Sequence, residues 1–415
     1  MSVPTFDPFS PQTLADPYPE FARFVAAQPV FWCEPLGYWV VSRYHDCRRV
    51  LRDYETFSAS NSLAPVVPPC PAAGQALADG AFRSIPTLTN VDPPAHNRTR
   101  RIAYLAFTPR RVAALEEFIR DLVRGYLAER MTGGHADLVP ALTWELPARV
   151  IFKVLGVPAE DVDSVKAGAA NRLLFMFGRA QPDEQVRIAT GMAAFWRYCE
   201  ELAEDRRAAP RDDFTSDLVH TPDRDGQPLR QQEVATILFG LLLAGHETTT
   251  NLLGHAVRRL LEHRESWTEL CADPSLFPGA VEEVLRYDSS VIHWRRRTRH
   301  PVELHGVELP AEANVLVAIG AANRDPAVFA DPDRFDIRRA NAAEHLSFGF
   351  GPHYCLGAPL ARLEARVVLE ELTAALPGLR LTPGQAFEFT PIIGFRGPRS
   401  VQVEWDDRAH VPPDR

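Results

Sequence analysis

One short segment restricts the fold and the chemistry of this chain more than any other. Residues 346–360 read Leu-Ser-Phe-Gly-Phe-Gly-Pro-His-Tyr-Cys-Leu-Gly-Ala-Pro-Leu, and a strongly helical run over 361–375 follows directly. Cys355 therefore lies just before a helix, where exposed N–H groups and the positive end of the helix dipole lower a thiol pKa and favour metal ligation. The glycines, Gly357 among them, permit tight turns and close approach of a large flat ligand. A lone cysteine in a glycine-rich loop is more often a buried structural residue, so its neighbours decide between the two interpretations.

The spacing of these neighbours matches a known motif. Residues 348–357 follow the pattern Phe-Gly-x-Gly-x-His-x-Cys-x-Gly and resemble the haem-binding loop of cytochromes P450. The resemblance implies that Cys355 is the axial ligand of haem b and that Gly357 borders the cofactor. It also implies that Phe348 packs beside the sulfur and that His353 reaches a haem propionate. An axial thiolate donates electron density to iron and favours O–O cleavage, which agrees with this assignment.

A long helix is expected over 232–263, and its middle carries an unusual group of polar residues. The run Ala-Gly-His-Glu-Thr-Thr, residues 244–249, resembles the oxygen-activating element of the same family, Ala/Gly-Gly-x-Asp/Glu-Thr-Thr. The resemblance implies that Ala244 borders the haem and that Thr248 hydrogen-bonds the bound oxygen. Glu247 would then relay protons from solvent, as general acid catalysis requires.

The same polar residues also admit a purely structural interpretation. Polar side chains in an apolar helix are unfavourable unless they hydrogen-bond or line a wet cavity, and hydroxyls at 248–250 can bond back to helical carbonyls. Together with the cysteine loop, the pattern favours oxygen activation. Gly245 is a weak helix former and indicates an opening of the helix where oxygen binds. His246 is interpreted as a polar residue satisfied within the fold and is not assigned to catalysis.

Two further groups of charged residues support the resemblance. Glu283 and Arg286 lie three apart on one helix face and resemble the family's Glu-x-x-Arg, which Arg334 would complete. A surface pair of this kind contributes only about 0–1 kcal/mol, whereas the resemblance implies a buried structural network behind the cysteine loop.

The haem propionates need cationic partners. Residues 92–101 resemble the family segment that supplies them, and His96 and Arg100 lie four apart on one helix face. Arg296 occupies the place of a third propionate ligand, with Arg297 as the alternative because several arginines are consecutive there.

Helical periodicity dominates the chain, and the expected fold class is mainly α, of the α+β type. Helices are expected at 43–53, from near His96, and at 111–130; short alternating strands are expected at 38–41, 302–304, 315–317 and 401–405. The proline cluster at 64–71 predicts a long ordered loop. The resemblance implies a helix-rich triangular prism with small β-sheets, in which haem lies between the long helix and the cysteine-loop helix. Because no linker interrupts the sequence, we expect one haem-thiolate domain over 1–405 and a tail or linker stub at 406–415.

Composition excludes several other classes. The net charge of −9 argues against nucleic acid or an anionic membrane as the main partner. The N-terminus does not resemble a signal peptide, and no run of eighteen apolar residues occurs, so a soluble, cytoplasmic protein is expected. Six cysteines without a Cys-x-x-Cys pair make disulfides and zinc poor expectations.

Electrons for oxygen activation must come from outside the chain. It carries no Gly-x-Gly-x-x-Gly loop and no cysteine spacing suited to an iron–sulfur cluster. Residues 239–251 and 289–297 resemble bacterial P450s whose haem module is fused to a phthalate-dioxygenase-type reductase. This places FMN and a 2Fe-2S cluster on a separate or deleted reductase, with a ferredoxin as another donor. We expect a positive face on the cysteine side of this protein, to which the electron donor binds. It would be formed by Arg110, Arg111, Arg362 and Arg366.

The expected activity is insertion of one oxygen atom from O2 into small hydrophobic substrates, with aromatic ones favoured, at the expense of NADH or NADPH. Largely apolar segments at 173–178 and 391–395 favour hydroxylation, heteroatom dealkylation or sulfoxidation of such molecules. The alternatives are a hydrogen peroxide-driven peroxygenase and a non-catalytic haem sensor. The acid–alcohol pair Glu247–Thr248 favours an O2-dependent monooxygenase over both, and a monomer is expected.

Overall fold

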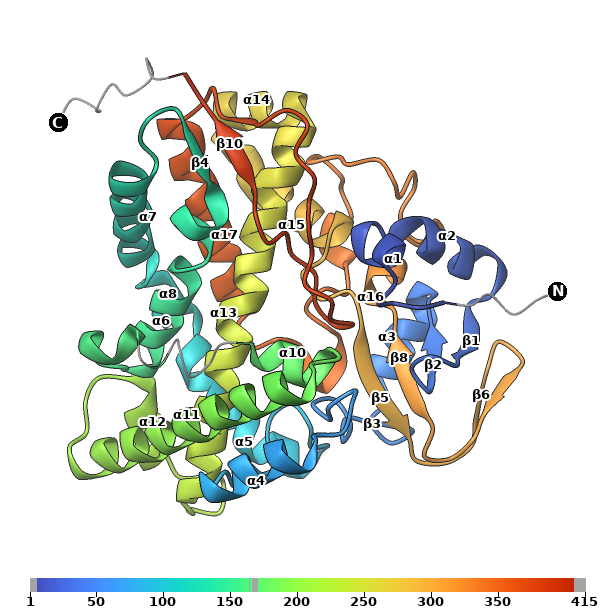
Figure 1. Ribbon diagram of the computed structural model, residues 1–415, viewed down its shortest axis with the longest axis vertical. Helices are drawn as coiled ribbons and strands as arrows, with labels where there is room; N and C mark the ends of the chain where they lie inside the picture. Colours follow the sequence, from blue (N-terminus) through green and yellow to red (C-terminus); the bar gives the residue numbers. More distant parts are fainter. Residues whose placement is uncertain (1–5, 164, 166–170, 407–415) are drawn as a thin grey trace.

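The structure is a computed structural model that describes residues 6–163, 165 and 171–406. Figure 1 shows a helical part on one side and a part that contains most of the strands on the other, with the long helix α13 (Gln231–Glu262) crossing the helical part. Apart from Asp406, the predicted tail at 406–415 lies outside the described residues.

Helices make up most of the described chain. The α-helices are α1 (Pro11–Ala15), α2 (Tyr18–Ala27), α3 (Tyr44–Arg52), α4 (Pro71–Asp79), α5 (Ala95–Ala103), α6 (Pro109–Ala113), α7 (Glu116–Arg130), α8 (Leu146–Leu155), α10 (Arg172–Phe177), α11 (Pro182–Ala208), α12 (Phe214–His220), α13, α14 (Arg264–Ala272), α15 (Phe277–Tyr287), α16 (Ile319–Ala322) and α17 (Ala358–Ala375). Short 3₁₀ or π turns occur at η1 (Tyr104–Phe107), η2 (Val139–Thr143), η3 (Ala159–Asp161), η4 (Pro274–Leu276), η5 (Ala342–Glu344) and η6 (Gly351–His353).

The strands are short. They are β1 (Val30–Cys33), β2 (Tyr38–Val41), β3 (Phe57–Ser58), β4 (His135–Asp137), β5 (Trp294–Thr298), β6 (Val302–Leu304), β7 (Val307–Leu309), β8 (Asn314–Val317), β9 (Arg380–Leu381) and β10 (Gln402–Glu404). Among the described residues the largest sheet has the order β1-β2-β8-β5-β3, in which β2 and β8 run parallel. A second sheet, β4-β10-β9, joins the C-terminal strand to the middle of the chain. The expected helix-rich α+β class with small sheets is confirmed.

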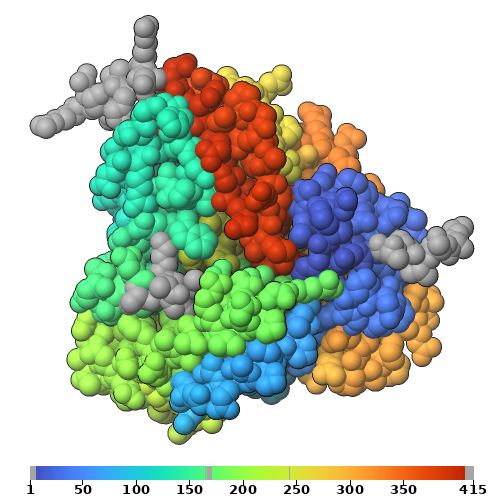
Figure 2. Space-filling view, in the orientation of Figure 1, coloured from blue at the N-terminus to red at the C-terminus, as the bar shows by residue number. Residues whose placement is uncertain are grey.

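The C-terminal segment holds separate parts of the chain together. Figure 2 shows it (red) on the surface between the N-terminal part (blue) and the segment that includes α7 (teal). The guanidinium of Arg396 donates hydrogen bonds to the carbonyl oxygens of Leu14 and Ala15. The segment around Arg396 is thereby tied to the C-terminal end of α1.

Most of the predicted helices agree with the structure within a few residues, but the helix predicted over 111–130 is divided into α6 and α7. The predicted helix over 232–263 is α13, and the run after the cysteine is α17. The sequence before α13 has no serine, threonine or aspartate cap, but the Glu233 carboxylate accepts a hydrogen bond from the Arg230 N–H at 2.8 Å. Glu233 therefore satisfies one of the N–H groups that a helix start leaves unpaired.

The prediction of one long ordered loop between α3 and α5, around the proline cluster at 64–71, is wrong, because α4 (Pro71–Asp79) begins at the last proline of the cluster. Pro71 is the first residue of this helix, a position where the missing N–H costs no helical hydrogen bond. Ala73 is buried, and α4 packs against α11.

The largest apolar core surrounds α13, which contacts α8, α11, α15 and α17. A second core lies under α2 and the first strands, and a third lies between α3 and the sheet. No helix of the described residues is long and apolar enough to cross a membrane.

Candidate functional site

A large cavity lies between α13 and the start of α17, where the sequence placed the cofactor. It holds about 1700 Å³ of space with its open mouth included. Ala244 and Thr248 line it from α13, and Cys355 and Gly357 line it from the cysteine loop. The two motifs, more than one hundred residues apart in the sequence, thus face one space.

The cysteine loop is a tight, glycine-dependent turn. The Cys355 N–H donates to the Phe348 carbonyl at 2.9 Å, which closes the loop. Gly349 and Gly351 have φ angles of +74° and +75°, in the left-handed region that favours glycine. A Cβ atom on Gly357 would lie 3.9 Å from the Cys355 sulfur, in van der Waals contact with it.

The predicted lowering of the Cys355 pKa is wrong for the chain taken by itself. The N–H groups of Gly357 and Ala358 do lower the pKa, as expected at a helix start, but desolvation outweighs them and raises it. A nearby cation, Arg100, also lowers it. The helix start therefore lowers the pKa of the Cys355 thiol as predicted, but by less than burial raises it. A bound metal cation would add the charge that is needed to keep the thiol ionised.

Thr248 lies on the opposite wall of the cavity. Its hydroxyl donates to the Ala244 carbonyl at 2.6 Å. The predicted opening of the helix at Gly245 is wrong, since α13 is continuous from Gln231 to Glu262. Gly245 serves packing instead: a Cβ atom there would lie 2.8 Å from Cγ1 of Ile151 on α8.

The surroundings of Glu247 include a buried cation, Arg172, that the sequence did not reveal. Burial raises the pKa of Glu247 to about 7, and Arg172 opposes the shift. The Arg172 side chain is fully buried, lies over the rings of Phe195 and Phe239, and donates one hydrogen bond to the Phe239 carbonyl at 3.1 Å. No motif marks Arg172, because its burial depends on how α10 packs against α11 and α13.

Basic side chains gather at one end of the cavity. Arg100, Arg296 and His353 line it, and the His96 ring centroid lies 4.3 Å from that of His353. Within the described part of the chain, the buried Nε2 atoms of His96 and His353 form no hydrogen bond, and the Asp92 carboxylate lies 3.9 Å from His353 Nε2. Burial, and then the charges of Arg296 and His96, lower the pKa of His353 to about 3. Such a cluster is unfavourable without anionic groups to bind.

The structure separates Arg296 from Arg297. Arg296 is only 2% exposed and lines the cavity, and burial lowers its pKa to about 10. The side chain of Arg297 is 45% exposed and forms an ion pair with Glu312 at 3.0 Å. Neighbouring positions of β5 point to opposite faces of the sheet, so only Arg296 reaches the cavity.

The prediction that Arg334 completes the buried network is wrong. Glu283 and Arg286 are fully buried and paired at 2.7 Å, but the Arg334 side chain is 71% exposed. The further guanidinium comes from Arg339, whose Nε lies 3.3 Å from the Glu283 carboxylate. Arg334 contributes its carbonyl oxygen, which accepts hydrogen bonds from Arg286 and Arg339.

Aromatic side chains form another wall of the cavity. Phe177, Trp294 and Phe395 all line it. The Phe177 and Phe395 ring centroids lie 4.8 Å apart with a T-shaped geometry, and Trp294 lies 6.2 Å from Phe177 and 6.1 Å from Phe395.

Most of the expected positive face is neutralised. Arg111 pairs with Asp217, Arg362 pairs with Glu282, and Arg366 pairs with Glu116 and Glu370. Only Arg110 of the four predicted cations is an exposed arginine without an ion pair among the described residues.

These residues fit haem on structural grounds. The cavity places a cysteine sulfur on one wall and the face of α13 that carries Ala244 and Thr248 on the other. At one end, histidine Nε2 atoms that form no hydrogen bond among the described residues and the guanidinium groups of Arg100 and Arg296 match two propionates. The apolar remainder matches the porphyrin faces and a hydrophobic substrate.

Comparison with known proteins agrees with this geometry. The sequence profile of the family "Cytochrome P450" matches residues 275–374. The chain is 38% identical to the cytochrome P450 monooxygenase PikC of Streptomyces venezuelae over 94% of this chain and 91% of that protein.

Solved structures show the same similarity. Cytochrome P450 CREJ in complex with (4-ethylphenyl) dihydrogen phosphate superposes with a TM-score of 0.91 at 40% identity, over 97% of this chain and 99% of that chain. An intact type IV self-sufficient cytochrome P450 monooxygenase superposes with a TM-score of 0.94 at 39% identity, over 98% of this chain and 53% of that longer chain. The protein described here therefore belongs to the cytochrome P450 family, has its fold, and is a haem-dependent monooxygenase.

Proposed function

We propose that this monooxygenase binds haem b through the Cys355 thiolate and inserts one oxygen atom from O2 into small, neutral aromatic substrates. The observation that carries the proposal is the opposition of Cys355 and Thr248 across one cavity with a cluster of basic groups at its end. Haem bound through a thiolate supplies the activation of O2, because the axial sulfur donates electron density that favours O–O cleavage.

The residues around the cofactor have separate tasks. Cys355 would ligate the iron, and Gly357 would leave room beside the sulfur, because a Cβ atom there would contact it at 3.9 Å. Phe348 packs beside the loop, where the Arg362 guanidinium lies 4.6 Å from its ring centroid. His96, Arg100, Arg296 and His353 would hold the propionates, and Ala244 would border the porphyrin.

Protons reach the oxygen side through α13. The Thr248 hydroxyl donates to the Ala244 carbonyl, and by rotating about its Cα–Cβ bond it would offer the same proton to an oxygen atom bound in the cavity. Glu247, with its pKa raised to about 7, exchanges protons with solvent near neutral pH, as a proton relay requires. The Arg172 charge limits how far that pKa rises.

The shape and chemistry of the distal wall support an aromatic substrate. Phe177, Trp294 and Phe395 offer edges and faces against which a planar ring packs. The similar protein that was solved with an alkylphenyl phosphate gives the same indication for the ring. The cations that line this cavity, Arg100 and Arg296, are assigned to the propionates, so we favour neutral ring substrates.

Electrons come from NADH or NADPH through a reductase or a ferredoxin. The similarity to the haem part of a self-sufficient enzyme supports a donor with FMN and a 2Fe-2S cluster, either on a separate protein or on a fused reductase.

The experiment that tests this function follows the origin of the inserted oxygen. Purified protein is given NADPH, a ferredoxin, its reductase and 4-ethylphenol under ¹⁸O₂, and the product is analysed by mass spectrometry. We expect one ¹⁸O atom per product molecule. Label that enters only from H₂¹⁸O₂ without reductant would establish a peroxygenase, and haem binding without product from a panel of neutral aromatics would favour a sensor.

A further inference from the structure

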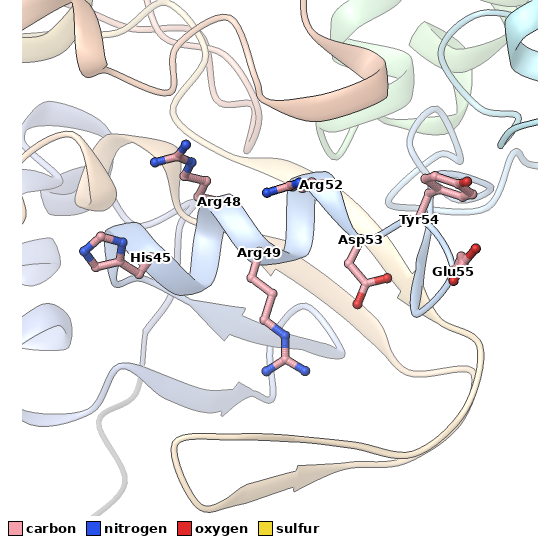
Figure 3. A pocket seen from close by; sticks show the side chains of 7 residues that line it. All are labelled: His45, Arg48, Arg49, Arg52, Asp53, Tyr54 and Glu55. Atoms are coloured by element: carbon pink, nitrogen blue, oxygen red, sulfur yellow. The ribbon is translucent and has the colours of Figure 1, made fainter.

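Among the described residues, arginines without a carboxylate partner occur in two kinds of surroundings. Arg48, Arg49 and Arg52 project from α3 and line an open groove, where water solvates their charges (Figure 3). Arg295 on β5, in contrast, is only 1% exposed, and its guanidinium group forms no ion pair in the described part of the chain. A buried cation is unfavourable unless groups of the protein replace the lost water. The contacts of Arg295 therefore indicate what this side chain does.

The Arg295 guanidinium holds a loop that borders the cavity. It donates hydrogen bonds to the carbonyl oxygens of Ser62, at 2.8 Å, and Ala64. The Ser62 hydroxyl donates in return to the Arg295 carbonyl at 3.2 Å. Leu63, which lies between the two bonded carbonyls, lines the cavity. Because a guanidinium presents its N–H donors in fixed directions within one plane, it fixes both carbonyls at once, and with them Leu63.

The same guanidinium also contacts the aromatic wall of the cavity. Its central carbon lies 4.3 Å from the ring centroid of Phe177, a distance typical of a cation–π contact. Phe177 lines the cavity and packs against Trp294 and Phe395. Arg295 itself does not line the cavity. One side chain behind the wall therefore fixes the positions of Leu63 and Phe177 relative to each other.

We propose that Arg295 is a positioning residue that holds the Leu63 and Phe177 sides of the cavity together and thereby limits the substrates to flat rings with unbranched substituents. This inference rests on the function proposed above. The two sides cannot separate without breaking hydrogen bonds of a buried cation and its contact with the Phe177 ring, which is unfavourable. A flat ring with a straight substituent needs no such movement, whereas a branched substituent is wide in every direction and does.

The test replaces Arg295 by methionine and by lysine. Methionine has a similar length and no charge, and apolar replacements of buried charged groups are often tolerated, so Arg295→Met is expected to fold. Lysine keeps a charge beside Phe177 but cannot hold two carbonyls as a planar fork. The control is Arg264→Met, because Arg264 likewise donates to two carbonyls, those of Pro377 and Leu379, and none of these three residues lines the cavity.

Two measurements are made on the haem-loaded proteins. Calorimetric titration gives the dissociation constants of 4-ethylphenol and 4-tert-butylphenol, and the ratio of the two constants measures selectivity. Hydrogen–deuterium exchange of segments 61–66 and 172–178 measures how firmly the two sides of the cavity are held, and it requires no substrate.

We expect the parent to bind 4-ethylphenol at least about tenfold more tightly than 4-tert-butylphenol, and this ratio to fall below about threefold in Arg295→Met. The fall should come mainly from tighter binding of the branched phenol. Arg295→Lys should give an intermediate ratio. Exchange in both segments should become about threefold faster in Arg295→Met, because their shared hydrogen bonds and ring contact are lost. Arg264→Met should keep the selectivity and the exchange of the parent.

Several results would overturn the proposal. They are equal binding of the two phenols by the parent, an unchanged ratio in Arg295→Met, an equal loss of affinity for both phenols in that variant, and the same change of ratio in Arg264→Met. An equal loss for both phenols would assign Arg295 a general structural role.

Failure of the proposed function is recognised separately. A parent protein that binds neither phenol rejects neutral rings as the substrate class. The exchange measurement still decides the role of Arg295 in that case, because unchanged exchange of segments 61–66 and 172–178 in Arg295→Met shows that Arg295 does not hold them.

Discussion

The Arg339 guanidinium reaches the buried carboxylate of Glu283, with Nε 3.3 Å from Oε2. The same guanidinium donates to the carbonyl oxygens of Ala330, Asp331 and Arg334. The Glu-x-x-Arg pair is therefore linked to the segment 330–334 through Arg339 and through Arg286 itself, which donates to the carbonyl oxygens of Pro332 and Arg334. The Arg334 side chain points to solvent.

We predict that Arg339→Ala destabilises the protein and that Arg334→Ala does not. Removing Arg339 leaves Glu283 with fewer charged hydrogen bonds, which lowers the free energy of unfolding by about 1–3 kcal/mol. Arg334→Ala should change it by less than about 0.5 kcal/mol, as at other exposed sites. Chemical denaturation of both variants measures the difference, and equal effects would restore Arg334 to the network.

Substitutions at the neighbouring residues Arg296 and Arg297 test which of the two binds a haem propionate. We expect Arg296→Ala to lose haem several times faster than the parent, because a buried cation facing the cavity is removed. Arg297→Ala removes an exposed ion pair and should retain haem normally. Transfer of haem to apomyoglobin measures both rates. A faster loss from Arg297→Ala alone would exchange the two assignments.

The sequence was most informative where one local pattern decides the structure. The bounds of α13 and the turn before α17 follow from periodicity, glycine placement and the spacing around Cys355. The helix α4 was missed because prolines before it also predict a loop, and its single buried alanine gives little periodicity.

The site residues that were predicted wrongly or missed are those whose contacts come from distant parts of the sequence. Arg334, Arg338 and Arg339 are close in sequence, and only the fold determines which of them turns back to Glu283. Arg172 was missed because its neighbours Phe195 and Phe239 come from other helices. The sign of the Cys355 pKa shift depends on desolvation, which the helix start alone does not reveal.

Thr248→Ala should uncouple electron consumption from product formation. Without the hydroxyl, a bound oxygen atom loses the group that holds it for protonation, and electrons are lost to hydrogen peroxide. We expect at least a tenfold lower yield of product per NADPH, with little change in NADPH consumption. Thr248→Ser should keep most of the coupling. Thr250→Ala is the control, because Thr250 is buried and does not line the cavity. Full coupling in Thr248→Ala would remove Thr248 from the mechanism.

The raised pKa of Glu247 predicts a pH dependence of coupling. The carboxyl is half protonated at about pH 7 and increasingly ionised above it. Because the protonated carboxyl is the proton donor, the yield of product per NADPH falls as pH rises through about 7. Glu247→Gln removes this fall and most of the coupling. A pH profile of product and peroxide for both proteins tests this, and the same step in Glu247→Gln would assign it to another group.

The raised pKa of Glu247 also predicts how the stability of the protein changes with pH. Burial favours the neutral carboxyl, so its contribution is fully present below the unfolded pKa and is lost as pH rises through the folded pKa. Glu247→Gln should therefore gain stability relative to the parent between about pH 4.5 and 7, with a constant difference above that range. Denaturation midpoints that stay parallel across this range would contradict the raised pKa.

The assignment of Cys355 as the haem ligand is the central claim, and the spectrum of the reduced protein under carbon monoxide tests it most directly. A deprotonated cysteine opposite the gas shifts the Soret band strongly to the red. We predict this shifted band for the parent protein and its loss in Cys355→His, which retains haem through a neutral ligand. A band at the position typical of histidine-ligated haem in the parent protein would contradict the account.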